Sequence, residues 1–441
     1  MRSVDPSSYG AYQRELYATF RAPVISADPL QWESLAKRVM PSTAWNYVAG
    51  SAGVWRTKDA NIRAFDRYRL RPRMMVDATI RDLSVTLFSD GPRTRAPLKL
   101  PGPLIAAPIG VQGIVHKDGE QVTARACEKL AVPMVLSTAA TTTIEQAAAA
   151  NGNGQRWFQL YWPVQGHDDI TLSLLSRAKA SGYDVLVVTA DTMAFGWRPA
   201  DLNNSAYSPF VFGEGVQIGL SDPAFRRYYA RLKAAAPKRS IWASLRELWS
   251  LVRRPSSIWT SFKLLWTILT GRTPMALAFL DIVTCAIYRP WEDLSFLREH
   301  WSGPIVLKGI QTVEDARLAA EHGMDGIIIS NHGGRQVDGA MASLDALVEI
   351  AADKHVRESG LTLLFDSGVR TGTDVLKALA LGAHAVLIGR PYIYGLALAG
   401  QKGVEHVFRC LLAEVDITLG LMGRRSLSEL CPADIQTVSG M

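Results

Sequence analysis

The stretch GIIISNHGGRQVDG, residues 326–339, joins an apolar run to a cluster of polar residues. The run is short and rich in β-branched side chains, which predicts a strand buried on both faces. His332 follows this strand, and a histidine can gain or lose a proton near neutral pH. Two glycines then let the backbone approach a ligand closely, and Arg335 offers a planar fork that suits a carboxylate. His332 as a base and Arg335 as a carboxylate anchor lie close together in the chain. This spacing predicts proton or hydride transfer beside a bound organic acid.

Similar apolar runs alternate with helical patterns from about residue 104 onward, as expected of repeated strand–helix units. The eight predicted strands are residues 104–109, 134–137, 157–161, 185–189, 305–308, 326–330, 361–365 and 385–388. Helical patterns between them cover residues 119–130, 168–181, 313–321, 344–352 and 373–381. Eight such units favour an α/β fold of the closed (β/α)8 (TIM) barrel type over an open doubly wound sheet. No glycine-rich dinucleotide-binding motif follows an early strand, which is a further argument against the open doubly wound sheet.

The barrel is predicted to occupy residues 101–427, between an N-terminal cap over residues 1–100 and a tail over residues 428–441. In the cap, residues 30–39 and 45–50 have helical patterns, the first followed by a proline and the second ending at a glycine. A long insertion, about residues 196–303, separates the fourth and fifth predicted strands.

The insertion accounts for the net positive charge of the chain. Residues 226–272 contain eleven lysines and arginines and one acid, a net charge of +10, which leaves −3 for the rest of a chain whose net charge is +7. Within it, residues 241–252 and 258–269 place apolar and tryptophan side chains on one helical face, opposite basic residues. Such helices can lie in a membrane interface, or they can form a lid or an oligomer contact that packs on protein. No uncharged run approaches the roughly 18–20 residues of a spanning helix.

Composition narrows the class of protein. An apolar content of 48% with 20% charged residues predicts a folded globular protein. The four cysteines are far apart with no CxxC pair, which argues against a disulfide framework or a metal site and favours a reducing compartment. No secretory signal is visible at the N-terminus, so a cytoplasmic location is expected. No nucleic-acid-binding module is found, so a small-molecule ligand is the better expectation.

Polar side chains gather where the predicted strands end. They are Gln159, Tyr161, Thr189, Asp191, Lys308, His332, Asp366 and Arg390. In a barrel these ends meet at one mouth, where active sites lie. One such residue alone could be a solvated strand end, but agreement among six strand ends predicts an active site. Glycine–arginine loops follow the last two strands, at residues 366–372 and 389–391, and these predict a phosphate site rather than simple tight turns.

The chain resembles the FMN-dependent α-hydroxy-acid oxidases and dehydrogenases from about Trp32 to Leu427, apart from the insertion. The motifs that carry the resemblance are SNHGGRQ at 330–336, FQLY at 158–161, TADT at 189–192, KG at 308–309, DSGVR at 366–370 and IGRP at 388–391. The resemblance implies FMN as cofactor, an L-2-hydroxy acid as substrate and a homo-oligomer, a tetramer or larger.

The resemblance also implies roles for individual residues. His332 would be the base, Asp191 would orient it, and Tyr161 and Lys308 would complete the catalytic group, with Lys308 beside the flavin. The substrate would be held by Tyr47, Tyr161, Arg198, His332 and Arg335. FMN would be bound by Ala107, Pro108, Ile109, Gly110, Ser137, Gln159, Thr189, Lys308, Ser330, Asp366, Ser367, Gly368, Arg370, Gly389 and Arg390. Alternatively, Asp191 and Arg198 could form a structural ion pair, and Tyr47 could be an ordinary packing aromatic.

Two positions point to a subclass. Gly110 stands where oxidases of the family usually carry alanine and lactate 2-monooxygenase carries glycine, and residues 47–50, 195–199 and 308–311 resemble the same branch. This implies oxidation of L-lactate with O2 to acetate, CO2 and water. The alternatives are an oxidase that releases the 2-oxo acid and H2O2, a quinone-linked dehydrogenase, or an inactive flavin-binding scaffold. Ala139 replaces a bulky tryptophan of glycolate oxidase, which predicts a pocket that admits more than the smallest side chains.

Overall fold

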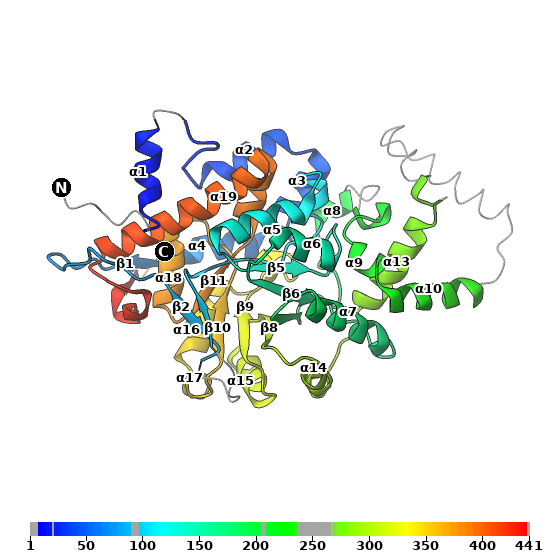
Figure 1. Ribbon diagram of the computed structural model, residues 1–441. Helices are drawn as coiled ribbons and strands as arrows, with labels where there is room; N and C mark the ends of the chain where they lie inside the picture. Colours follow the sequence, from blue (N-terminus) through cyan, green and yellow to red (C-terminus); the bar gives the residue numbers. More distant parts are fainter. Residues whose placement is uncertain are drawn as a thin grey trace.

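The computed structural model describes residues 8–19, 22–89, 97–203, 209–235, 266–268 and 270–438. Its centre is a closed barrel of eight parallel strands in the order β10-β11-β4-β5-β6-β7-β8-β9 (Figure 1). The strands are β4 (Leu104–Ala106), β5 (Met134–Ser137), β6 (Arg156–Leu160), β7 (Val185–Thr189), β8 (Ile305–Ile310), β9 (Gly326–Ile329), β10 (Thr362–Phe365) and β11 (Ala385–Ile388). The predicted (β/α)8 barrel is confirmed. The first strand ends before its predicted end because Pro108 has no N–H to donate to the ladder.

The inside of the barrel is filled with apolar side chains. They are Ile105, Ala107, Val135, Trp157, Val185, Val187, Val306, Ile328, Leu364, Ala385 and Leu387, packed with Leu87, Phe88 and Leu100. The last three come from the hairpin of β2 (Val85–Leu87) and β3 (Leu98–Leu100). Phe88 packs against Trp157, and its N–H donates to Oγ1 of Thr362, the first residue of β10. The hairpin therefore closes the amino-terminal end of the barrel.

Helices cover the outside of the barrel in the predicted alternation. They include α5 (Gly119–Leu130), α6 (Ile144–Asn151), α7 (Asp168–Ala180), α14 (Leu294–His300), α15 (Val313–Glu321), α16 (Ser343–Ala352), α17 (Lys354–Glu358), α18 (Gly372–Ala380) and α19 (Arg390–Leu421). The loop that precedes α18 is held by a capping box between Thr371 and Asp374. The same Asp374 carboxylate accepts from the N–H of Arg370, so the predicted phosphate loop has a defined backbone.

The N-terminal residues form helices α1 (Ala11–Ala18), α2 (Gln31–Val39), α3 (Ser42–Ala49) and α4 (Arg56–Arg63). Figure 1 shows α1 and α2 beside α19, and the buried Trp32 of α2 donates to the Ser26 carbonyl at 2.7 Å. Near the other end of the chain, β12 (Ile435–Thr437) pairs antiparallel with β1 (Tyr68–Leu70). The cap thus packs on helix α19 of the barrel, and the end of the chain pairs with a strand of the cap.

The insertion forms a helical unit at one side of the barrel, drawn in green in Figure 1. Its described elements are the α-helices α8 (Pro199–Asn203), α9 (Gln217–Leu220), α10 (Pro223–Ala235) and α13 (Arg272–Val283), and the short 3-10 helices η4 (Pro209–Phe212) and η5 (Trp291–Asp293). Phe279 of α13 packs edge-on against Phe225 of α10, with ring centroids 5.1 Å apart. The predicted amphipathic helices over 241–252 and 258–269 lie outside the described residues, apart from 266–268. Among the helices that are described, none has the length and apolar character needed to cross a membrane.

Candidate active site

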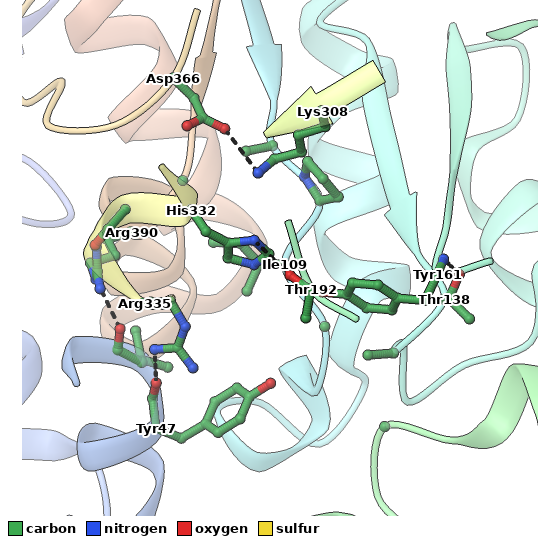
Figure 2. A pocket seen from close by; sticks show the side chains of 18 of the residues that line it. Tyr47, Ile109, Thr138, Tyr161, Thr192, Lys308, His332, Arg335, Asp366 and Arg390 are labelled. Carbon is green, nitrogen blue, oxygen red and sulfur yellow. Dashed lines mark hydrogen bonds and ion pairs between the residues drawn. The ribbon is translucent and has the colours of Figure 1, made fainter. Parts of the chain in front are cut away.

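A cavity of about 1200 Å³, counting the solvent at its opening, lies at the carboxyl ends of the barrel strands. The five predicted substrate-binding residues, Tyr47, Tyr161, Arg198, His332 and Arg335, all line it. The predicted cofactor-binding residues that line it are Ala107, Pro108, Ile109, Gly110, Lys308, Asp366, Ser367, Gly368, Arg370, Gly389 and Arg390. Figure 2 shows Lys308 and Asp366 at one end of the cavity and Tyr47 at the other, with His332 between them. Ser137, Gln159, Thr189, Asp191 and Ser330 are outside the lining.

His332 and Asp191 form a hydrogen-bonded pair. His332 Nδ1 lies 2.9 Å from Asp191 Oδ1, which also accepts from the Thr192 hydroxyl at 2.8 Å. Burial lowers the pKa of His332 despite the nearby Asp191 carboxylate, so the imidazole is neutral at pH 7. Burial opposes ionisation of Asp191, yet His332 and Lys308 bring the pKa of its carboxyl below the ordinary value. Since a carboxylate only accepts hydrogen bonds, Nδ1 carries the proton and Nε2 is left to accept one.

The backbone at the histidine is left-handed at three successive residues. The φ angles are 59° at His332, 62° at Gly333 and 76° at Gly334. Only glycine adopts this region at little cost, so His332 is held in a strained conformation of the kind found at active sites. A Cβ on Gly333 would lie 2.7 Å from Arg390 Nη1, and one on Gly334 would lie 2.6 Å from the Lys58 N–H nitrogen. Both glycines are thus favoured by φ, and Gly334 is also required by its close contact with the Lys58 backbone.

Two arginines lie next to each other at the substrate end. Arg335 Nη1 donates to the carbonyls of Tyr47 at 2.6 Å and Gly50 at 2.9 Å, and its guanidinium lies over the Tyr47 ring. Arg198 donates from Nε to the Arg335 carbonyl at 2.9 Å and from Nη2 to Gln336 Oε1 at 2.6 Å. Burial and the neighbouring Arg335 charge lower the pKa of Arg198 to about 10, so it stays protonated at neutral pH. These contacts replace the ion pair with Asp191 considered above.

Two tyrosines face the cavity beside these arginines. Burial raises the pKa of Tyr47, and burial and the nearby Tyr47 raise the pKa of Tyr161. Both phenols are therefore protonated and can donate hydrogen bonds. Tyr47 also packs edge-on against Phe210, with centroids 6.3 Å apart, so it combines a packing contact with a place in the lining.

Polar side chains behind the cavity form a hydrogen-bonded row across neighbouring strands. Ser137 Oγ donates to Gln159 Oε1 at 2.9 Å, and Gln159 Nε2 donates to Thr189 Oγ1 at 2.9 Å. On the next strand, Lys308 Nζ donates to Ser330 Oγ at 3.0 Å. The register of the parallel strands brings these residues side by side, because Ser137 pairs with Gln159 and Thr189 with Lys308.

Gly110 lies directly against the loop that follows β5. A Cβ on Gly110 would be 2.5 Å from the Ala139 carbonyl oxygen and 2.7 Å from the Ala139 Cβ. The next residue, Val111, donates its N–H to the same carbonyl at 2.8 Å. The absence of a side chain at position 110 therefore has a packing reason in this chain.

The sequence interpretation missed several residues. Gln336 was quoted within the opening motif without a role, yet it accepts from Gly196 N and Arg198 Nη2 and donates to the carbonyls of Asp191 and Ala194. The aromatic and aliphatic residues that line the cavity from the insertion were also missed. The roles of these residues depend on contacts with segments that are distant in the chain. The local sequence around a glutamine in a loop or a phenylalanine in an insertion does not reveal such contacts.

The closed barrel, with a half-buried histidine and several arginines at its mouth, has the arrangement of a (β/α)8 barrel enzyme. The chain belongs to the FMN-dependent dehydrogenase family, whose model matches residues 36–437. It is 43% identical over 421 residues to an FMN-dependent alpha-hydroxy acid dehydrogenase of Schizosaccharomyces pombe, covering 94% of this chain and 92% of the relative. It is 35% identical to an L-lactate oxidase of Lysinibacillus sphaericus, with 94% of each covered. A crystal structure of mandelate oxidase with (S)-2-phenylpropionate superimposes with a TM-score of 0.70 at 30% identity, covering 95% of this chain and all of that one.

The cofactor is FMN, and the arginines that line the cavity suit a cofactor that carries a phosphate. In the described part of the chain, none of Arg198, Arg335, Arg370 and Arg390 forms an ion pair with a carboxylate. Burial raises the pKa of the Asp201 carboxyl, and the charges of Arg335 and Arg198 oppose that rise. At the other end, Glu33 forms its ion pair with Lys58. Burial and the like charges of Arg335 and Arg370 lower the pKa of Arg390 to about 10. Arg198 is buried and the other three are half-buried, and their hydrogen bonds go to uncharged groups. Cations shielded from water without a counter-charge are costly, so these arginines fit a phosphate at one end and a carboxylate at the other.

Proposed function

We propose that the chain oxidises an L-2-hydroxy acid to the 2-oxo acid, with O2 as the final acceptor. The observation that carries the proposal is the His332–Asp191 pair at a cavity that also holds two arginines. When bound, FMN accepts the two electrons that the substrate loses. The substrate also loses two protons, and O2 with two electrons and two protons gives H2O2. The family's activity on α-hydroxy acids supports the reaction class.

The base in this reaction is His332. Its Nε2 takes one proton from the substrate, and the Asp191 carboxylate stabilises the imidazolium that forms. The Thr192 hydroxyl donates to the Asp191 carboxylate and also lies 3.2 Å from His332 Nδ1. The ring therefore cannot rotate without losing its contacts with both Asp191 and Thr192. Lys308, a buried cation on β8, stabilises negative charge on the bound cofactor, since electrostatic stabilisation is strong where water is excluded.

The substrate carboxylate is held by Arg198 and Arg335. Each has N–H groups left over from its bonds to the protein, because a guanidinium carries five donors. The Tyr47 and Tyr161 hydroxyls add neutral donors on the same side. The phosphate of FMN is held by Arg370 and Arg390, with backbone N–H groups of the loops that carry Gly368 and Gly389.

For the fate of oxygen we propose the lactate 2-monooxygenase outcome. The 2-oxo acid and H2O2 react before either is released, giving CO2, water and a carboxylic acid one carbon shorter, which is acetate from L-lactate. The resemblance at Gly110 supports this outcome. Release of the 2-oxo acid first would instead make the chain a simple oxidase.

Anaerobic reduction followed by product analysis tests both parts of the proposal. L-lactate mixed with the holoenzyme without oxygen is expected to bleach the flavin absorbance, and oxygen is then expected to restore it with release of acetate and CO2. Pyruvate and H2O2 in equal amounts would contradict the monooxygenase outcome alone. Failure of every L-2-hydroxy acid to bleach the flavin would contradict the oxidation itself.

Gln336 is a positioning residue for Arg198. Replacing Gln336 with alanine removes a charge-assisted hydrogen bond of roughly 1.5–3 kcal/mol, so we expect KM to rise about 10- to 150-fold with a smaller change in kcat. Gln336→Glu should weaken binding as well, because its carboxylate competes with the substrate for the same guanidinium. Gln165→Ala, at an exposed site bonded to Asp293, is the matched control. A drop in kcat at unchanged KM would show that Gln336 acts elsewhere.

A further inference from the structure

The cavity continues beyond the charged groups to an apolar wall supplied by the insertion. The wall consists of Phe210 from η4 and Phe279, Leu280 and Val283 from α13, all of which line the cavity. Phe279 is 1% exposed and packs into the insertion, whereas Leu280 is half-buried and faces the space. The segment after β7 therefore forms part of the substrate site as well as covering the barrel.

The wall is fixed in place next to the carboxylate anchors. The hydroxyl of Thr273 on α13 donates to the Val211 carbonyl at 2.8 Å, which joins α13 to η4. Phe210 then lies between Tyr47, at 6.3 Å, and Phe195, which stacks on it at 5.7 Å. Because Tyr47 also contacts Arg335, a substrate held by that arginine has its side chain within reach of Phe210.

The charged side chains that line the cavity come from elements other than this wall. The acidic and basic residues in the lining are Arg198, Lys308, His332, Arg335, Asp366, Arg370 and Arg390. Among the described residues 209–235, 266–268 and 270–284, none of those that line the cavity is acidic or basic. The polar member of the wall, Thr284, donates its hydroxyl to the Leu280 carbonyl at 2.9 Å. Ala139, which also lines the cavity, has only a methyl group to fill it. The described wall therefore suits an apolar side chain rather than a charged one.

We propose that the preferred substrates are L-2-hydroxy acids with an uncharged apolar side chain of at least isobutyl or phenyl size. The inference rests on the proposed function and names the substrate class of the same site. Burial of apolar surface against the wall favours the larger acids, since each buried methylene group contributes about 0.8 kcal/mol, or about fourfold in kcat/KM. A second carboxylate, as in malate, would be desolvated there without a partner.

A graded series of acids tests the inference. Anaerobic flavin reduction is measured with L-lactate, L-2-hydroxybutanoate, L-2-hydroxy-4-methylpentanoate, L-3-phenyllactate and L-malate. The isobutyl acid has three more carbons than lactate, so we expect its kcat/KM to be about 50-fold higher, with malate below lactate. A rate that is highest for lactate and falls with size would overturn the inference and leave the proposed oxidation intact. No reduction by any acid would instead overturn the proposed function.

Two substitutions on one helix supply the structural control. Leu280→Asn places an amide in the wall and is expected to lower the preference for the isobutyl acid over lactate by about tenfold or more. Leu277→Asn on the same helix, at a position 42% exposed and outside the lining, is expected to keep the wild-type preference. Binding of the matching 2-oxo acids, followed by the flavin spectrum, gives a readout independent of turnover. Equal preference in the two variants would overturn the role of the wall.

Discussion

The His332→Gln variant is expected to bind FMN normally and to be reduced by its 2-hydroxy acid about 10²–10⁴-fold more slowly than the wild type. Glutamine cannot take up a proton at Nε2, and it leaves the Asp191 carboxylate without the charge it is placed to stabilise. Stopped-flow measurement of anaerobic flavin bleaching gives the rate, and the flavin-to-protein absorbance ratio gives occupancy. His355→Gln, on the exposed helix α17, is the matched control. A variant that reduces FMN at the wild-type rate would exclude His332 as the base.

The same residue sets the pH dependence of the reaction. The pKa of His332 in the folded protein is below its ordinary value of 6.5, and the base acts in its neutral form. The reduction rate should therefore be constant near pH 7 and fall as the pH is lowered through the pKa of His332. This acid limb should be missing from the profile of His332→Gln. Its persistence there would assign the titration to another group.

The Arg390→Met variant is expected to lose affinity for FMN by about 10- to 150-fold, the effect of removing one charge-assisted hydrogen bond of roughly 1.5–3 kcal/mol. Arg390 is one of the two arginines proposed to hold the phosphate, and it also donates to the carbonyls of Val48, Gly50 and Gly333 at 3.0 Å. Dissociation of FMN is followed by the fluorescence that the free cofactor regains. Unchanged affinity would place the phosphate away from this loop.

Loss of the carbonyl bonds could also destabilise the fold, so two companion variants separate the effects. Arg390→Lys keeps the charge but not the planar fork, and it should bind FMN with intermediate affinity. Arg317→Met removes an exposed arginine that pairs with Asp353, and its affinity for FMN should equal that of the wild type. Thermal unfolding of the apoproteins then shows how much of the loss of FMN affinity in Arg390→Met comes from lower stability of the fold. Equal affinity of Arg390→Met and Arg390→Lys would argue against a charge contact with the phosphate.

Much of the site could be predicted because its residues follow strands of strong local pattern. His332 follows β9, Lys308 lies in β8 and Asp366 follows β10, so recognising the barrel was enough to bring them to one mouth. The glycines at 333 and 334 indicated that the backbone there could be left-handed. The residue type at position 332 gave no such indication, and the φ of 59° at His332 is imposed by its surroundings. Gln336 could not be assigned, since its four hydrogen bonds go to groups on a loop far away in the sequence.

By itself, the sequence determined the strand order, the chemistry at the strand ends and the family. These depend on short-range periodicity and on residue types that a flavin, a phosphate and a carboxylate require. Only the tertiary structure decided how the insertion meets the cavity, and so which side chains a substrate touches beyond its carboxylate. Phe210 and Leu280 acquire that role through packing between distant segments, such as Phe279 against Phe225 and Thr273 against Val211. Packing of this kind depends on shape in three dimensions, which no local pattern of apolar residues encodes.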